Sequence, residues 1–172
     1  DFMEFKIISL LEYSLLNWDD FEELFRNSFR KIQYSLEIYT KDYESDRKIW
    51  GKENFINNIK NGAKLVLMYR ENELVGTATL TDEIHKGEKS LCLTKFAVKE
   101  IYRGNNYGEK IIEFCTEVAK NEQYEWMTLY TSELLNKLVR YYKKNKFVEY
   151  KKIRVNQFGI QYNRVFFEKK VV

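Results

Sequence analysis

The stretch that most constrains this chain is YRGNNYGEK, residues 102–110, where two glycines and two asparagines separate two apolar patterns. The run before it, SLCLTKFAV, is typical of a strand, and the run after it repeats apolar residues at helical spacing. A helix that starts at such a turn leaves several backbone N–H groups without intrahelical partners. The helix dipole adds about half a positive charge there, so the turn suits an anion, above all a phosphate.

The residues of the turn support this interpretation. Gly104 and Gly108 lack the Cβ atoms that would hold a phosphate away, and Asn105 and Asn106 tolerate positive φ better than other non-glycine residues. Arg103 adds charge of the right sign. The turn is neither a Walker A loop nor a Rossmann fingerprint, because it lacks the GK[ST] ending and the GxGxxG spacing. A plain turn that only connects two elements is the alternative.

The order of apolar patterns predicts an α/β domain. Strands are expected at 4–10, 64–70, 74–80, 90–98, 126–131, 147–153 and 159–169, and helices at about 18–29, 47–60, from 107, and 132–145. Asn17 or Asp19 would cap the first helix, and Gly62 would end the second. Residues 34–46 fit no pattern. A meander followed by strand–helix–strand implies a mixed sheet with at least one parallel crossover.

One strand breaks its own alternation. Leu91 and Leu93 occupy one face, but Phe96 and Val98 continue the pattern one residue out of phase. One extra residue near Thr94–Lys95, a β-bulge, would produce this slip. A strand that is buried on both faces is the alternative.

Composition excludes several classes of protein. The net charge is only +3, from 29 basic and 26 acidic residues of mixed order, so no nucleic-acid partner is expected. With one histidine and two separated cysteines, Cys92 and Cys115, no metal site is expected, and both thiols are expected to be buried and reduced. No apolar run reaches about 18 residues and no signal-peptide pattern is found, so we expect a cytoplasmic protein with no membrane span.

The segment FAVKEIYRGNNYGEKIIEFC resembles the central motif of the GNAT superfamily of acetyltransferases. Phe96 and Val98 match its strand, Arg103 and Gly108 match its phosphate loop, and a helix from about Tyr107 follows. Tyr142 stands five residues before Phe147, which is the usual spacing in the family. The resemblance implies one domain over residues 1–172, with a mixed, mostly antiparallel sheet of six to seven strands and about four helices.

Four positions depart from the family pattern. Asn106 replaces the middle glycine of the loop, and Lys146 replaces the glycine before Phe147. Glu100 stands where many members have proline, and Asn136 lies one residue closer to Tyr142 than the usual asparagine. None of these changes abolishes the loop geometry.

The resemblance implies an N-acetyltransferase that uses acetyl-CoA and moves its acetyl group directly to a primary amine. Tyr142 is the expected general acid, with Tyr141 as its competitor, and a backbone N–H near Phe96 would stabilise the oxyanion. Asp82, Glu83 and His85, in an expected polar loop, are the candidate bases. The expected cofactor-binding residues are Phe96, Ala97, Val98, Arg103, Gly104, Asn105, Asn106, Tyr107, Gly108, Glu109 and Asn136.

The acceptor is less constrained. In the family the segment between the first two helices walls the acceptor site, and here it is rich in acids and tyrosines that include Glu37, Tyr39 and Asp42. Such residues suit a small cationic amine such as a polyamine, although they would also balance nearby lysines. A peptide N-terminus is another possible acceptor. A non-catalytic acyl-CoA-binding module is the alternative function, and the aromatic C-terminal hairpin with an exposed last strand suggests a homodimer.

Overall fold

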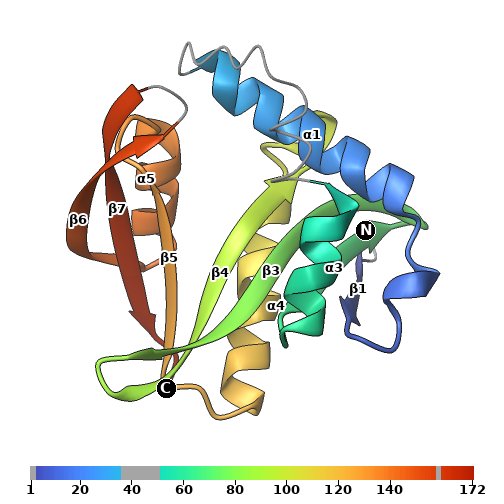
Figure 1. Ribbon diagram of the computed structural model, residues 1–172, viewed down its shortest axis with the longest axis horizontal. Coiled ribbons are helices and arrows are strands. Elements are labelled where there is room, and N and C mark those ends of the chain that lie inside the picture. Colours follow the sequence, from blue (N-terminus) through green and yellow to red (C-terminus); the bar gives the residue numbers. More distant parts are fainter. Residues whose placement is uncertain (1–2, 36–50, 158–159) are drawn as a thin grey trace.

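The computed structural model describes residues 3–35, 51–157 and 160–172 (Figure 1). Its strands are β1 Met3–Ile8, β2 Lys64–Arg70, β3 Glu73–His85, β4 Glu88–Val98, β5 Trp126–Ser132, β6 Val148–Gln157 and β7 Ile160–Lys170. Its α-helices are α1 Trp18–Ser35, α3 Lys52–Lys60, α4 Tyr107–Asn121 and α5 Asn136–Lys144. None of the helices in the described ranges has the length and apolar character that crossing a membrane requires.

All strands join one sheet in the order β1-β2-β3-β4-β5-β7-β6. Every neighbouring pair is antiparallel except β4 and β5, which run parallel and are connected through α4. A parallel pair needs such a crossover, because a tight turn cannot bring the chain back to the same end of the sheet. The mixed, mostly antiparallel sheet predicted from the sequence is confirmed.

Helices cover the sheet on both faces. Helices α1 and α3 pack on the N-terminal strands through an aromatic cluster in which Phe21 and Phe55 meet edge to face at 4.6 Å. Helices α4 and α5 lie on the opposite face, where α4 buries Ile111, Ile112 and Cys115 against the central strands. Burial of a large apolar side chain stabilises the fold by about 2 kcal/mol, so these contacts hold the helices against the sheet.

Several local predictions hold. The Asn17 side chain accepts a hydrogen bond from the Asp20 amide at the start of α1, as a cap should. Gly62 follows α3 with φ +97°, in the conformation that ends helices. The turn between β2 and β3 places Glu71 and Asn72 at positive φ, which matches the twist of a tight hairpin.

Other predictions are wrong. The segment 81–85 was expected to be a polar loop, but β3 continues through it to His85 and turns at Lys86–Gly87 into β4. Helix α5 begins at Asn136 rather than at residue 132. The last strand, β7, was expected at the edge of the sheet, but it lies between β5 and β6, and β6 forms the edge.

The predicted bulge in β4 is present. The β3–β4 register passes from Thr79 opposite Thr94 to Thr77 opposite Ala97, so one extra residue is accommodated on β4. Lys95 takes φ +50° there, which is uncommon for a residue with a side chain. As a result, Leu93 and Phe96 both pack on the α4 side, whereas the Lys95 ammonium reaches Asn54 of α3 on the other side.

Candidate active site

The central strands part from each other at the middle of the sheet. β4 pairs with β5 from Ser90 to Cys92, opposite Trp126 to Thr128, and the pairing ends there. Figure 1 shows the two strands side by side at one end and diverging towards the other. The β5-facing edge of β4 from Leu93 to Val98 therefore has no strand partner among the described residues. Apart from the Val98 carbonyl, which accepts from the Arg103 side chain, the main-chain polar groups of this edge are available to a ligand.

The Gly/Asn turn lies at the end of this open edge. After β4 a short 3-10 turn, Glu100–Tyr102, leads into residues 103–106 and then into α4. The N–H groups from Gly104 to Glu109 donate to no acceptor in the part of the chain that the structure describes. Residues 103–106 are exposed, and a ligand can therefore approach these amides. Free donors at a helix N-terminus are the usual basis of anion binding.

The two glycines of the turn serve different purposes. Gly104 has φ +85°, and a Cβ there would meet nothing within 4 Å, so its role is conformational. A Cβ on Gly108 would lie 2.7 Å from the Tyr141 hydroxyl and 3.0 Å from Phe96 Cζ. Gly108 therefore permits close packing of α5 and β4 against α4, a role that the sequence did not indicate. Asn106 takes φ +62° as the cap of α4, so it adopts a conformation that favours glycine.

The two tyrosines of α5 have different surroundings. Tyr142, expected to be the general acid, is 4% exposed and packs on Phe147 and Phe167 in the core. The ring of Tyr141 stacks on Phe96 with centroids 6.3 Å apart, and its buried hydroxyl has no hydrogen-bond partner in the described structure. Burial is the main cause that raises the pKa of both phenols, and Tyr141 also lies near the Glu109 carboxylate.

The other expected cofactor residues occupy the same region. On the open strand, Phe96 and Val98 pack towards α4, and Ala97 packs towards α1 and α3. The Arg103 guanidinium donates to the Val98 carbonyl at 3.2 Å, which ties the turn to the strand. Asn105 donates to the Tyr102 carbonyl within the turn.

The outer residues of the expected set come from the two helices. The Glu109 carboxylate in the first turn of α4 lies 3.7 Å from the Lys144 ammonium of α5, which leaves its main-chain N–H as the group that can face a ligand. The next residue of that set along the chain, Asn136, is exposed as the first residue of α5.

The three candidate bases lie on the extended part of β3, and each has a partner. Asp82 accepts a hydrogen bond from the Tyr124 hydroxyl, and His85 pairs with Glu168 at 2.5 Å. Glu83 accepts from Thr128 of β5 and from Ser90 of β4 at 3.2 Å. Thr128 is the last residue of β5 that pairs with β4, so Glu83 marks the point where the strands part.

The sequence named Lys95 only as the place of the expected bulge and did not indicate the surroundings of its side chain. Its ammonium donates to Asn54 Oδ1 at 2.7 Å and lies 4.8 Å from the centre of the Phe55 ring. Burial lowers its pKa to about 8. The available signal was a lysine inside an apolar strand, next to the alternation slip.

The expected acceptor residues Glu37, Tyr39 and Asp42 fall outside the described residues, and their prediction stays untested. The described part of the chain contains no group of three or more His, Cys, Asp and Glu side chains placed to hold a metal ion. Both cysteines are free thiols. Cys115 is buried as expected, whereas Cys92 is only partly buried.

A family model named the acetyltransferase (GNAT) family matches residues 18–147, which contain the open strand, the turn, α4 and both tyrosines. The chain belongs to this family. A comparison with curated proteins finds no match. The strand order, the parted central strands and the free amides of the turn are thus features of a GNAT domain in this chain.

Solved structures agree in fold. The chain is similar to the PaiA N-acetyltransferase of Thermoplasma acidophilum, solved in complex with coenzyme A, at 18% identity and TM-score 0.68 over 99% of both chains. An acetyltransferase of the GNAT family from Staphylococcus aureus Mu50 shares 20% identity, with TM-score 0.67 over 98% of this chain and 100% of that one. A GNAT acetyltransferase of Elizabethkingia anophelis with bound acetyl-CoA shares 18% identity over 70% of this chain and 83% of its own, with TM-score 0.57.

Proposed function

We propose that this GNAT domain binds acetyl-CoA and transfers its acetyl group directly to a primary amine. The observation that carries the proposal is the pairing of two unsatisfied main-chain surfaces, the open edge of β4 and the free amides from Gly104 to Glu109. The first suits an extended, amide-containing arm, and the second suits a diphosphate. Two neighbours of the same fold were solved with coenzyme A or acetyl-CoA bound, which supports this choice of ligand.

In this proposal each cofactor residue acts mainly through its backbone. The amides of residues 104–109 hold the diphosphate, and the exposed Arg103 adds positive charge beside them. Along the unpaired edge, the main-chain groups of Phe96 and the N–H of Val98 pair with the pantetheine arm. Ala97, which pairs with Thr77 of β3, holds that edge in place. The N–H of Phe96, next to the bulge, donates to the thioester carbonyl and stabilises the oxyanion that forms when the amine attacks.

The departing thiolate is stabilised by a tyrosine hydroxyl of α5. Because burial raises the pKa of Tyr141 and Tyr142 above that of a free phenol, and a thiol has a pKa of about 8.5, either residue acts as a hydrogen-bond donor rather than a full acid. Tyr142 holds the family position, but the unpartnered hydroxyl of Tyr141 beside Phe96 favours Tyr141 as the donor. Separate Tyr141→Phe and Tyr142→Phe variants decide between them.

Glu83 is the base that we propose among the three acids and bases of the extended strand. Its carboxylate bridges β3, β4 and β5 beside Ser90 and Thr128, about 20 Å along β4 from Phe96, so a chain of water molecules along the open edge carries the proton from the amine to it. The acceptor class is a small-molecule amine or a peptide N-terminus. The narrower proposal of a cationic amine such as a polyamine rests only on the composition of the segment that contains Glu37, Tyr39 and Asp42.

Two measurements test the function. Titration calorimetry with coenzyme A should give saturable binding, and Gly104→Ala should weaken it because φ +85° disfavours a side chain. Thiol release from acetyl-CoA should then depend on an added amine from a panel of amines and peptide N-termini. No heat at near-millimolar coenzyme A contradicts the proposal. Binding without thiol release for any amine, followed over a wide pH range, favours the acyl-CoA-binding module instead.

A further inference from the structure

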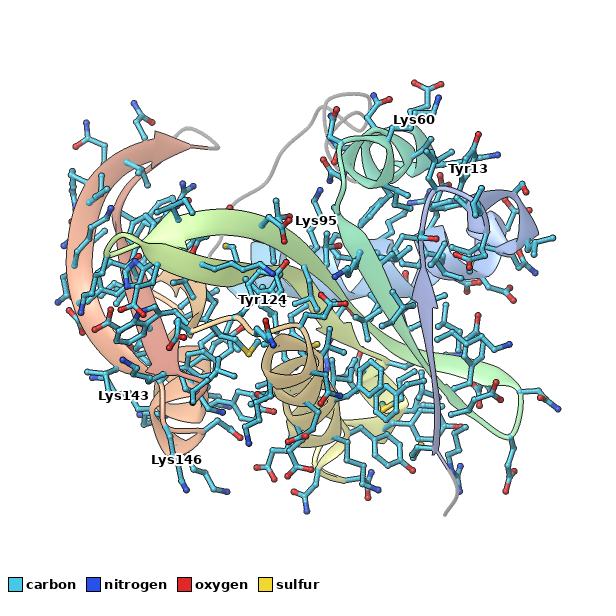
Figure 2. The ribbon with its side chains drawn as sticks, turned by 90° about the horizontal axis from the view of Figure 1, so that it is seen from below. Tyr13, Lys60, Lys95, Tyr124, Lys143 and Lys146 are labelled. Carbon is cyan, nitrogen blue, oxygen red and sulfur yellow. The ribbon has the colours of Figure 1, made fainter. Side chains whose placement is uncertain are left out.

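A lysine of β4 projects from the strand beside the proposed position of the reacting thioester. Lys95 occupies the bulge, directly before Phe96, and its side chain leaves the strand on the α3 face. Figure 2 shows it on β4, between the β5–β7 part of the sheet and α3. A bulge re-aims a side chain relative to a regular strand, and here it directs a primary amine away from the packed α4 face.

The amine lacks the partner that a half-buried lysine usually has. Within the described residues no carboxylate lies at ion-pair distance from Lys95 Nζ, which contacts the neutral Asn54 amide and the Phe55 ring. Other lysines of the domain are paired, for example Lys99 with Glu73 at 2.7 Å. A partly buried ammonium without a counter-charge loses its proton more easily than an exposed one.

This environment changes the fraction of reactive amine. With a pKa of about 8, about a quarter of the Lys95 side chains are neutral at pH 7.5, whereas an ordinary lysine is neutral in about one molecule in a thousand. Only the neutral amine has the lone pair that attacks a thioester. Lys95 therefore has the chemistry of an acceptor, and it lies on the strand that we propose for the donor.

We propose that Lys95 is a self-acetylation site, modified by acetyl-CoA bound to the same chain. This inference rests on the proposed function. If the Phe96 N–H binds the thioester oxygen, the carbonyl carbon lies about 4 Å from that nitrogen, and a lysine side chain places its Nζ about 6 Å from its own Cα. Rotation about side-chain bonds brings the two atoms together once the hydrogen bond to Asn54 is released.

The step is balanced without another reactant. The neutral Nζ forms a bond to the acetyl carbon, the carbon–sulfur bond breaks, and coenzyme A leaves as the thiolate. The nitrogen then loses one proton, which the thiolate or water takes up. The product is an uncharged amide that can still donate to Asn54 Oδ1, so the modified side chain fits the same contact while its charge is removed.

The chain contains a matched control. Lys169 on β7 is also partly buried, its pKa is also lowered mainly by burial, and it lies 5.2 Å from the centre of the Phe147 ring. It pairs with Met127, away from the bulge. If acetyl-CoA from solution reacted with any partly buried neutral amine, saturating coenzyme A would slow the labelling of neither lysine. If position beside the bound thioester matters, Lys95 is labelled much faster.

The test is to incubate the intact protein with acetyl-CoA, measure its mass over time and map acetylated peptides. We expect one acetyl group per chain at Lys95, at least about tenfold faster than at Lys169, and strongly slowed by saturating unacetylated coenzyme A. Lys95→Arg should abolish this fast phase, and Lys169→Arg should leave it unchanged. Peptide mapping of the wild-type chain decides the question even if a variant folds poorly.

Calorimetry on the same sample separates the two proposals. Coenzyme A binding with no preferential acetylation of Lys95, or with labelling that excess coenzyme A does not slow, overturns the self-acetylation inference alone. Absence of coenzyme A binding overturns the proposed function and this inference with it.

Discussion

The contact between Gly108 and Tyr141 yields a quantitative test of how the turn is packed. A methyl group on residue 108 would lie 2.7 Å from the Tyr141 hydroxyl, 3.0 Å from Phe96 Cζ and 3.5 Å from Tyr141 Cζ. The first distance is well inside van der Waals contact, so Tyr141 must move. Overpacking of this kind costs about 1–3 kcal/mol, partly offset by the gain of about 1 kcal/mol when alanine replaces glycine in a helix.

Removal of the hydroxyl should relieve most of this cost. In Gly108→Ala/Tyr141→Phe the contact at 2.7 Å disappears, and the 3.0 Å contact with Phe96 is then the closest. Tyr141→Phe alone should stabilise the protein by about 1 kcal/mol, because its hydroxyl is buried without a partner. The two substitutions should therefore show a favourable coupling of about 1–2 kcal/mol in a double-mutant cycle.

The assay is urea unfolding of the wild type, Gly108→Ala, Tyr141→Phe and the double variant. Unfolding is followed by tryptophan fluorescence and analysed at equal m-values. A matched control uses Gly104→Ala in place of Gly108→Ala. Alanine at residue 104 loses stability because of φ +85° and contacts nothing, so its change in unfolding free energy should add to that of Tyr141→Phe without coupling. If Gly108→Ala and Tyr141→Phe are additive within about 0.5 kcal/mol, the two residues do not constrain each other and the packing argument is wrong.

Three further predictions follow from backbone and titration properties. Lys146→Gly should raise the free energy of unfolding by about 1 kcal/mol, because Lys146 holds φ +70°; an unchanged or lower value in urea unfolding argues against strain there. Between about pH 8 and 10.4, Lys95 binds fewer protons in the folded than in the unfolded state, so the free energy of unfolding of the wild type should rise with pH relative to that of Lys95→Met. Urea unfolding at several pH values tests this, and a difference between the two proteins that does not change with pH contradicts it. Burial raises the pKa of Cys92 to about 11 and that of Cys115 to about 12, so a disulfide reagent at neutral pH should titrate both thiols quickly only after unfolding; rapid reaction of the folded protein contradicts this.

Elements with a strong local signal were predictable from the sequence. The slip between Leu93 and Phe96 indicated the bulge because alternation on a strand has a period of two, and any extra residue must disturb it. Asn106 and Lys146 replace family glycines, and both hold the positive φ that those glycines would adopt. The backbone geometry of the motif is therefore retained although the residues at these two positions differ.

Features set by long-range contacts were not predictable. Residues 81–85 are polar enough to resemble a loop, and they form a strand because residues 88–92 pair with them. Tyr141 and Tyr142 are adjacent on one helix, so helical spacing alone could not decide which hydroxyl would be left unpartnered beside the turn. The environment of Lys95 depends on Asn54 and Phe55, which are distant in sequence and come together only when α3 packs on the sheet.

The short pairing between β4 and β5 has a mechanical consequence. The two halves of the sheet, β1–β4 and β5–β7, are joined by main-chain pairing at Ser90–Cys92. Beyond Cys92 no direct main-chain hydrogen bond joins β4 to β5 in the described structure. A ligand bound between these strands would limit how far the two halves of the sheet can move apart. The rigidity of the domain would then depend on ligand occupancy, and the ligand-free domain would be the more flexible one.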